Sequence, residues 1–204
     1  MSPIEFRAIE SLDDPIYDAW LDLYQQAFPI DEQMLVSWHN EALRGKPAGE
    51  KRDQHLVAAV DLDGHLVGMA RYDYDSAAGA TALWYLATEE QIRGQGMGAQ
   101  VLAEIVRRAR ASHPDQPGLF FEVGDPATGA EPPGIAQRRI DWYRRNGAKM
   151  LTGIDYVQSV GWQPPRRMQI MALPFAELSA EECFNVASRL FGETVQRTGP
   201  LSLT

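Results

Sequence analysis

The feature that most constrains this chain is a glycine-rich turn between an apolar segment and a helical one. Residues 82–87, ALWYLA, form an apolar run with aromatic side chains, which predicts a strand buried on at least one face. Residues 99–110 instead repeat apolar side chains at helical spacing. Between them Gly94, Gly96 and Gly98 alternate with larger residues, so the backbone can turn with positive φ where the helix begins. The first amides of a helix lack internal partners and lie at the positive end of its dipole, which predicts a phosphate or pyrophosphate site.

Other interpretations of this turn have to be weighed. The string GQGMGA, residues 94–99, fits the dinucleotide-binding fingerprint, and Glu122 lies at roughly the separation expected of the ribose-binding acid. In dinucleotide-binding domains, however, the glycines follow the first strand directly, whereas here mostly polar residues 88–93 intervene in mid-chain. A P-loop is excluded because no Gly-Lys-Ser/Thr follows the glycines. A turn that only caps the helix is the structural alternative.

Apolar and alternating segments elsewhere predict strands in an α+β order. They lie at residues 3–9, 55–60, 65–72, 80–87 and 118–123, and the last two strands come from 148–151, 154–160 and 167–173. The early strands indicate a largely antiparallel sheet. Because the strand at 80–87 reaches the strand at 118–123 through a helix, these two should run parallel.

Helix signals occur before and after the glycine turn. Pro15 follows two aspartates and begins a first helix, and Asp31 can cap a second helix that ends at Gly45. Ser179 with Glu182 forms a capping box, which predicts a C-terminal helix.

Residues 135–147, IAQRRIDWYRRNG, predict a further helix. Ala136, Ile140, Tyr143 and Gly147 follow one another at helical spacing and lie on one face. This spacing places Tyr143 inward near the helix end. It leaves open whether Tyr143 is a core residue or a functional one.

Length and composition predict a single compact domain. The chain has 204 residues, of which 45% are hydrophobic and 23% charged, enough for one sizeable core. We expect one domain over residues 1–175, a C-terminal helix packed on it at 176–192, and a polar tail at 193–204.

Net charge and cysteine content indicate which classes of ligand and which cellular compartment suit the chain. The formal net charge of −9 should repel nucleic acid and anionic lipid and favour cationic ligands such as amines. Cys183 is the only cysteine, so it cannot form an internal disulfide, and the chain suits a reducing compartment. No charged and apolar leader and no membrane-length apolar run is present, so we expect a cytoplasmic protein that binds neither nucleic acid nor membrane.

Two motifs together resemble one protein family. The run QIRGQGMG resembles motif A of the GNAT superfamily of N-acetyltransferases, whose pattern Q/RxxGxG/A falls on Arg93, Gly96 and Gly98 and also matches one step earlier. The family commonly carries FYxxxGF on the helix after its fifth strand. Here Trp142, Tyr143 and Gly147 match, with Ala148 in place of an aromatic residue.

The resemblance implies a fold, a cofactor and a reaction. The fold would be the GNAT-like α+β fold, with a largely antiparallel central sheet, one parallel βαβ unit splayed at the cofactor site, flanking helices and an extra C-terminal helix. Acetyl-CoA would lie between the strands at 80–87 and 118–123. An acetyl group would pass by direct attack, without a covalent intermediate, to a primary amine of a small molecule or peptide.

The resemblance also assigns residues. The pantetheine would pair with the backbone of Leu86, Ala87 and Thr88. The pyrophosphate would rest on amides of Arg93, Gly94, Gln95, Gly96, Met97 and Gly98. Tyr143 would protonate the departing thiolate.

The general base is not marked by the motifs. Many GNAT relatives have an acidic residue inside the central strand, but here no carboxylate lies between Asp75 and Glu89. Glu122, in the strand FFEV, is the best remaining candidate, although it could equally be a structural acid. Acids that could meet the cation of the substrate are Asp73, Asp75 and Glu32.

No metal site is expected. The histidines show no metal-ligand spacing and are predicted to be surface or edge residues: His39, His55, His65 and His113. Cys183 lies far from both motifs and is predicted to be inert.

Two other function classes remain open. The chain could be a non-catalytic acyl-CoA sensor, because the strand carboxylate is missing, or an NAD(P)-binding oxidoreductase. Neither the acceptor amine nor the oligomeric state follows from the sequence, and a homodimer is one option.

Overall fold

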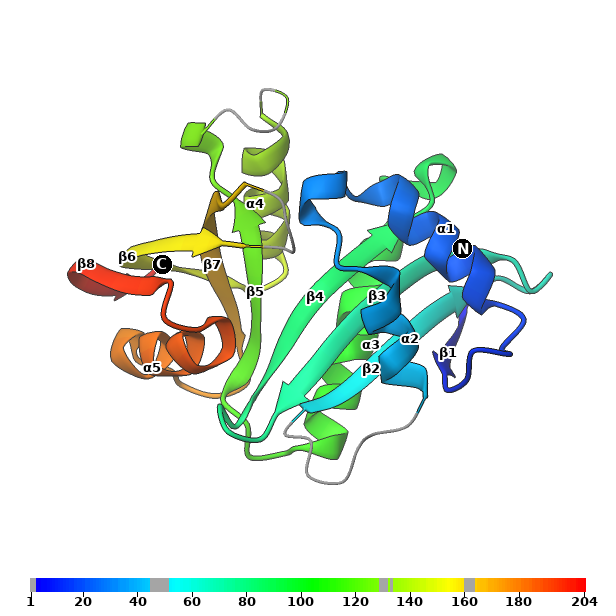
Figure 1. The fold of residues 1–204 in the computed structure, drawn as a ribbon, viewed down its shortest axis with the longest axis horizontal. Coiled ribbons are helices and arrows are strands. Elements are labelled where there is room, and N and C mark those ends of the chain that lie inside the picture. The colour runs from blue at the N-terminus through cyan, green and yellow to red at the C-terminus, as the bar shows by residue number, and fades with distance from the viewer. Residues whose placement is uncertain (1–2, 45–51, 129–131, 133, 160–163) are drawn as a thin grey trace. The chain divides into compact units, whose positions relative to one another are not determined.

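The computed structural model describes residues 3–44, 52–128, 132, 134–159 and 164–204. Within them the strands are β1 (Glu5–Ile9), β2 (Arg52–Val60), β3 (Leu66–Asp75), β4 (Ala80–Thr88), β5 (Gly118–Gly124), β6 (Lys149–Gln158), β7 (Arg166–Pro174) and β8 (Val195–Leu203) (Figure 1). The α-helices are α1 (Tyr17–Ala27), α2 (Val36–Leu43), α3 (Met97–Ser112), α4 (Ile135–Arg145) and α5 (Ala180–Phe191). The short 3₁₀ helices are η1 (Ile30–Glu32), η2 (Glu90–Ile92) and η3 (Pro126–Thr128).

The described strands are hydrogen-bonded in the order β1-β2-β3-β4-β5-β7-β6-β8. β4 and β5 run parallel, with Thr81 opposite Leu119 and Ala82 opposite Phe120. The pairs β1–β2, β5–β7, β6–β7 and β6–β8 are antiparallel. The predicted α+β fold, a mostly antiparallel sheet with one parallel pair and an added C-terminal helix, is therefore confirmed.

The chain divides into two compact units. The first unit holds residues 1–73 and 83–112, and the second holds residues 74–82 and 113–204. The glycine turn and α3 belong to the first unit, whereas β5 and α4 belong to the second. The single domain over residues 1–175 stays a prediction.

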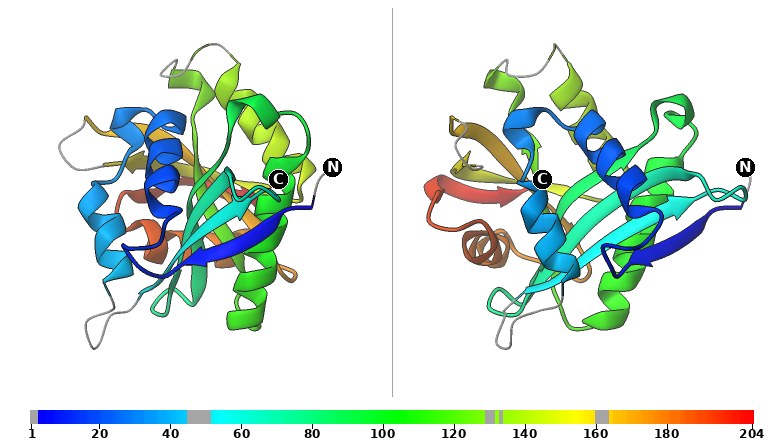
Figure 2. Two further views of the ribbon diagram at one scale, coloured as in Figure 1. Left: turned by 90° about the vertical axis from the view of Figure 1, so that its right-hand side faces the viewer. Right: turned by 45° about the vertical axis from the view of Figure 1, so that its right-hand side comes forward.

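Aromatic side chains of α1 fill the core of the first unit. Figure 2 shows α1 and α2 on one face of β2, β3 and β4, with α3 on the other face. Trp20 and Tyr24 are fully buried. The indole N–H of Trp20 donates to the carbonyl of Val57 at 3.1 Å, and the ring of Tyr24 meets the ring of Tyr85 edge-on, with centroids 4.7 Å apart. The side of α1 that carries Trp20 and Tyr24 is thus its buried face.

The second helix differs from its prediction. Asp31 lies in η1, and α2 begins only at Val36. The cause is a tertiary contact, because the hydroxyl of Tyr85 donates to the carbonyl of Glu32 at 2.8 Å and accepts from the amide of Met34 at 3.0 Å. These two backbone groups are satisfied by a side chain of β4, so they do not have to be satisfied by a continuous helix.

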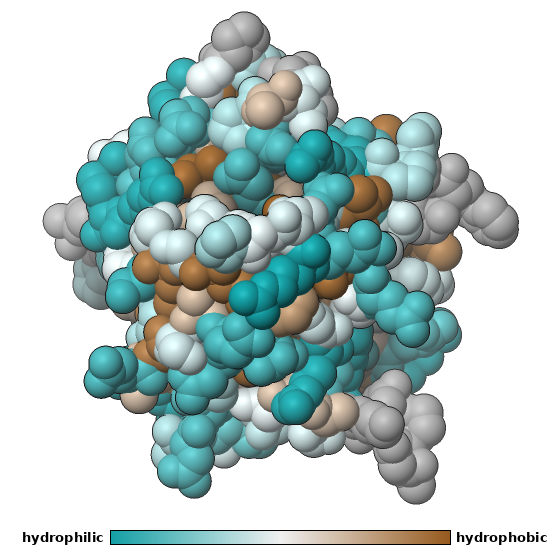
Figure 3. All heavy atoms as spheres, turned by 90° about the vertical axis from the view of Figure 1, so that its left-hand side faces the viewer, coloured by the Kyte–Doolittle hydropathy of each residue, from teal (hydrophilic) through white to brown (hydrophobic). Residues whose placement is uncertain are grey.

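Most of the predicted polar tail, residues 193–204, forms a strand. Residues 195–203 form β8, paired with β6 from Tyr156 opposite Val195 to Leu151 opposite Leu203. Most β8 side chains are exposed or half-buried, and Figure 3 shows hydrophilic surface broken only by separate hydrophobic patches on the side where β8 and α5 lie in Figure 1. Backbone pairing with β6 therefore supports this strand, and apolar periodicity could not have shown it.

A glycine allows β6 and β8 to lie this close together. Gly153 has φ +81°, and a Cβ built there would stand 2.2 Å from the carbonyl oxygen of Pro200. The register of β6 shifts around this position. The predicted segments 148–151 and 154–160 consequently form one irregular strand, β6, which ends at Gln158. Residues 160–163, at the end of the second segment and the start of the predicted turn, lie outside the described residues.

The C-terminal helix begins as predicted. The amide of Glu182 donates to Oγ of Ser179 at 3.2 Å, and the amide of Ser179 donates to Oε2 of Glu182 at 2.9 Å. Cys183, one residue further, is fully buried, and this burial raises the pKa of its thiol to about 12. A thiol in that environment is a poor nucleophile, which supports the prediction that it is inert. No described helix has the length and apolarity of a membrane span.

Candidate functional site

The predicted phosphate-binding turn connects β4 to α3. Gly94 and Gly96 have φ of +80° and +83°, a region that favours glycine. Both are exposed, and neither amide is bonded to another described residue. α3 then begins at Met97 and runs for 16 residues. Two unbonded amides thus lie just ahead of the positive end of a long helix, as an anion site requires.

The other residues of the turn differ in what they expose. The side chain of Met97 is buried at 7% exposure, so only its backbone can meet a ligand. Arg93 and Gln95 are exposed, and the side-chain amide of Gln95 donates to the carbonyl of Gln91 at 3.3 Å. The backbone amides of these two residues donate to the carbonyls of Glu90 and Ile92 at 3.2 and 3.3 Å. Gly98 is half-buried in the first turn of α3.

The end of β4 leads into this turn. Leu86 and Thr88 are half-buried, whereas the side chain of Ala87 lies in the core. The amide of Glu89 donates to the carbonyl of Val67 at 3.2 Å, which ties this end of β4 to β3. The role of residues 86–88 in cofactor binding stays a prediction.

Tyr143 lies in the second unit on the buried face of α4. Its side chain is 8% exposed, and its ring lies 4.2 Å from that of Phe121 between centroids. Burial raises the pKa of Tyr143 to about 12, so the hydroxyl stays protonated at neutral pH. That hydroxyl makes no hydrogen bond with another described residue, unlike most buried tyrosines.

Glu122 is half-buried on β5 and is held by side chains of β6. The hydroxyl of Tyr156 donates to Oε1 of Glu122, and the amide of Gln158 donates to Oε2 at 2.6 Å. Burial, followed by the charge of Glu122, raises the pKa of Tyr156, so Tyr156 remains the donor in this pair. Tyr156 and Gln158 thereby orient the two carboxylate oxygens of Glu122.

The structure places Tyr143 and Glu122 on opposite sides of β5. Tyr143 packs on Phe121, and Glu122 is the next residue of the strand. Successive strand side chains point to opposite faces.

The other candidate acids have structural partners. Asp73 is 2% exposed and lies 3.5 Å from Nε of Arg71. Asp75 accepts from the amides of Ala77 and Ala78 at 2.8 and 3.0 Å and so shapes the turn after β3. Glu32 is buried in η1.

One histidine prediction was wrong. His39 is fully buried, and its Nδ1 accepts from the guanidinium of Arg71 at 2.8 Å. Desolvation, with a smaller contribution from Arg71, lowers the pKa of His39 from 6.5 to about 3. The apolar spacing of α2 could not indicate this, because the partner comes from β3.

A group with metal-ligand proximity occurs at the β2–β3 turn. Atoms of Asp61, Asp63 and His65 lie within 4.8 Å of one another. Oδ1 of Asp61 already accepts from the amides of Asp63 and His65, each at 2.9 Å. The turn itself therefore accounts for this grouping.

Comparison with known proteins identifies the family. Residues 16–130, more than half of the chain, match the model of the acetyltransferase (GNAT) family. The chain belongs to the GNAT family of acetyltransferases. It is thus an acyltransferase of a family that uses acetyl-CoA, and the dinucleotide interpretation of the glycine turn gives way to this one. No curated protein matches the chain.

Solved structures show the same fold. A GNAT-family protein from Bacteroides thetaiotaomicron, described as an acetyltransferase, is 22% identical with a TM-score of 0.67, over 92% of this chain and 98% of that one. The ribosomal-protein-S18-alanine N-acetyltransferase of Escherichia coli is 16% identical with a TM-score of 0.56, over 86% and 96%. The IAA acetyltransferase of Bacillus cereus is 13% identical with a TM-score of 0.54, over 85% and 100%. At these identities the likeness concerns the fold alone.

The sequence missed Tyr156 and Gln158, the partners of Glu122. Their spacing of two along β6 is the only signal that puts them on one face of a strand. That β6 lies two places from β5, with β7 between them, is a property of the sheet order.

Proposed function

We propose that this GNAT protein transfers an acetyl group from acetyl-CoA to a primary amine of a small molecule or peptide, by direct attack. The observation that carries the proposal is the pair of unbonded amides at Gly94 and Gly96, ahead of α3. A pyrophosphate needs donors of this kind, so these residues fit the cofactor. Within the predicted turn from Arg93 to Gly98, the amides of Gly94 and Gly96 are the available donors, because those of Arg93 and Gln95 already donate to backbone carbonyls. The backbone of residues 86–88 would pair with the pantetheine.

When bound, acetyl-CoA supplies an acetyl group activated as a thioester. Glu122 is the proposed base, which takes a proton from the acceptor amine directly or through a water. Tyr156 and Gln158 orient its two oxygens. A carboxylate oxygen that already accepts a hydrogen bond can still take a proton, because each oxygen has more than one acceptor position.

Tyr143 is the proposed acid. Its pKa of about 12 keeps the proton on the hydroxyl at neutral pH. A thiolate has a much lower proton affinity, with a pKa near 8.5 for an ordinary thiol. Tyr143 therefore stabilises the departing sulfur mainly by hydrogen bonding.

The test begins with the cofactor loop. Gly96→Ala forces a side chain into φ +83°, where a Cβ would have nothing within 4 Å, so backbone strain is its only direct effect. Calorimetry should show at least about tenfold weaker acetyl-CoA binding. Gly79→Ala is the matched control, because it has φ +65° and equally open surroundings but lies in the β3–β4 turn. Equal affinity in both variants would remove the loop assignment.

Turnover is tested separately. Thiol release from acetyl-CoA is measured with a panel of small amines and N-terminal peptides, and a rate that depends on the amine supports N-acetyl transfer. Binding of acetyl-CoA without turnover for any amine would favour a non-catalytic sensor. Absence of acetyl-CoA binding would contradict the proposal itself.

A further inference from the structure

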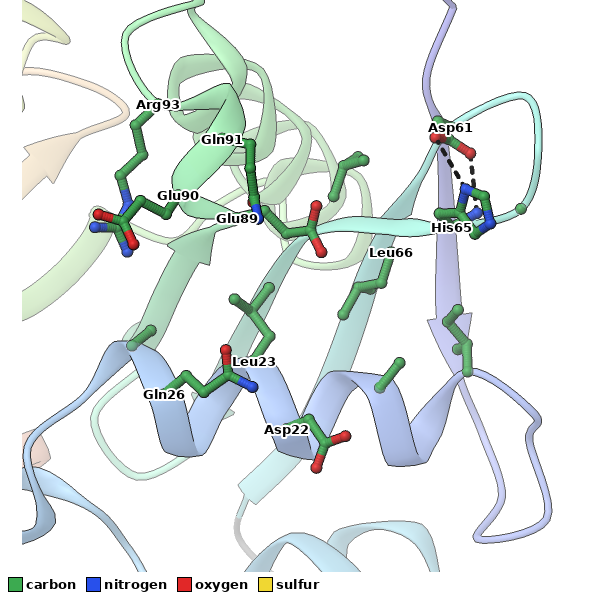
Figure 4. A pocket seen from close by; sticks show the side chains of 15 residues that line it. Asp22, Leu23, Gln26, Asp61, His65, Leu66, Glu89, Glu90, Gln91 and Arg93 are labelled. Carbon is green, nitrogen blue, oxygen red and sulfur yellow. Dashed lines mark hydrogen bonds and ion pairs between the residues drawn. The ribbon is translucent and has the colours of Figure 1, made fainter.

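The first unit contains a cavity that lies beside the predicted cofactor turn and shares only Arg93 with the predicted cofactor-binding residues. It has a volume of about 660 Å³ and lies between α1, the β2–β3 turn and the connector after β4 (Figure 4). Its lining residues all belong to the first unit. Small-molecule sites commonly have volumes of about 300–1,000 Å³, so the cavity is large enough for a metabolite.

The charged lining is mostly acidic. Asp22 comes from α1, Asp61 from the β2–β3 turn, and Glu89 and Glu90 from the connector, against the single guanidinium of Arg93. Asp61 is engaged locally, since its Oδ2 lies 3.6 Å from Nδ1 of His65, the remaining basic group of the lining. The cavity therefore carries an excess of negative charge.

Three of these carboxylates lack partners. Asp22, Glu89 and Glu90 make no ion pair and no side-chain hydrogen bond with another described residue. Asp22 and Glu90 are exposed, and Glu89 is half-buried. Like charges that converge on a cavity without compensation favour a cationic ligand over a neutral or anionic one.

The cavity also has an apolar floor. Leu23 and Leu66 are buried and line it, together with Ile16. Figure 4 shows Leu23 and Leu66 between the side chain of Glu89 and helix α1. A ligand here would gain by laying an aliphatic body on these side chains while its charged ends meet the carboxylates.

The acetyl-CoA phosphates do not suit this surface. Arg93 both lines the cavity and begins the glycine turn, but Asp22, Glu89 and Glu90 would repel a pyrophosphate. We propose that the cavity is a separate binding site for an organic cation with an aliphatic body, with Asp22 on one wall and Glu89 and Glu90 on the other taking its ammonium groups. This inference goes beyond acetyl transfer and does not depend on it.

The experiment measures binding without acetyl-CoA. Cadaverine, pentylamine and pentanediol share a five-carbon body and differ in charge, and each is titrated into the protein by calorimetry and by ligand-observed NMR. Cadaverine should bind at least about fivefold more tightly than pentylamine, and the diol should not bind. Cadaverine binding should weaken when ionic strength rises from about 0.01 M to about 1 M, since the Debye length falls from about 30 Å to about 3 Å.

Variants locate the site. Asp22→Asn with Glu89→Gln should weaken cadaverine binding at least about tenfold, because two facing charges are removed. Glu41→Gln is the matched control, since Glu41 is exposed on α2 in the same unit and does not line the cavity. Its affinity should stay within about twofold of the native protein. Melting curves of all variants should coincide, because the substituted carboxylates have no described partners to lose.

Several outcomes would overturn the site. They are equal binding of the diol and the diamine, equal weakening by Glu41→Gln, and no binding of cadaverine at millimolar concentration. None of them affects acetyl-CoA binding or amine-dependent thiol release, so the failure of this site and the failure of the transferase proposal are distinguishable.

Discussion

Asp73 in the first unit and Glu122 in the second are both acidic side chains within strands, yet their surroundings differ. Asp73 is 2% exposed and lies beside the equally buried guanidinium of Arg71. Burial raises the pKa of Asp73, while Arg71 lowers it. Glu122 is only half-buried, and neutral groups of Tyr156 and Gln158 donate to both its oxygens.

The difference separates a structural acid from a candidate base. A carboxylate paired with a buried cation has its charge compensated inside the protein, and protonating it would leave that cation alone. A half-buried carboxylate whose oxygens are oriented by hydrogen bonds can be reached by a ligand and can exchange a proton with it. The sequence offered both residues as candidates, and their partners distinguish them.

The largest effect is expected for Asp73, the acid with a structural role. Asp73→Asn should lower the free energy of unfolding by about 3–5 kcal/mol, because the charge of Arg71 is left uncompensated in the interior. Urea denaturation measures this loss. Replacing Asp73 and Arg71 together by leucine should recover much of it. A loss below about 1 kcal/mol for Asp73→Asn would show that Arg71 does not depend on this partner.

Glu122→Gln tests the role of Glu122 as the candidate base. Turnover should fall by about 100-fold or more, equivalent to about 2.7 kcal/mol, while acetyl-CoA affinity and melting temperature change little. Steady-state thiol release and calorimetry measure the two quantities. Tyr156→Phe should lower turnover less, by about tenfold, since it removes one orienting hydrogen bond and keeps the base. If Glu122→Gln unfolds the protein with turnover per folded molecule unchanged, both acids are structural.

The pH dependence of stability tests the interior around Arg71. The pKa of His39 is lowered from 6.5 to about 3, so its stabilising contribution is complete above pH 6.5 and is lost as the pH falls toward 3. By pH 5 the loss should reach about 2 kcal/mol. His39→Gln keeps an acceptor for Arg71 and should remove this decrease in the free energy of unfolding at low pH. His65→Gln changes an exposed site and should leave the decrease unchanged. Equal slopes in both variants would refute a buried, neutral His39.

The smallest effect is expected at Tyr143. Tyr143→Phe should lower turnover by at least about tenfold, or about 1.4 kcal/mol, with acetyl-CoA affinity nearly intact, because one donor and little surface are removed. The hydroxyl has no described partner to lose, so the melting temperature should hardly change. Unchanged turnover would make Tyr143 a core residue of α4.

Local signals predicted the parts of this protein that depend on neighbouring residues. Gly94 and Gly96 adopt the positive φ that their spacing indicated, and Ala136, Ile140 and Tyr143 form the buried face of α4. The capping box at Ser179 is also present. In each case the signal and the structure it predicts lie within about one or two helical turns.

Features that depend on distant partners could not be predicted in this way. Tyr85 of β4 binds backbone groups within the predicted second helix, which begins later than predicted. Residues 195–203 form a strand because they pair with β6, although their side chains show little apolar periodicity.

The sequence alone determined the GNAT motifs, the order of elements and the glycine turn ahead of α3, because these follow from backbone freedom and apolar periodicity over short stretches. Only the tertiary structure decided that Asp73 pairs with Arg71, that Glu122 meets Tyr156, and that α1 shares a cavity with the β4 connector. The physical reason is that a carboxylate's role depends on what lies beside it in space, and strand order brings those neighbours from far along the chain.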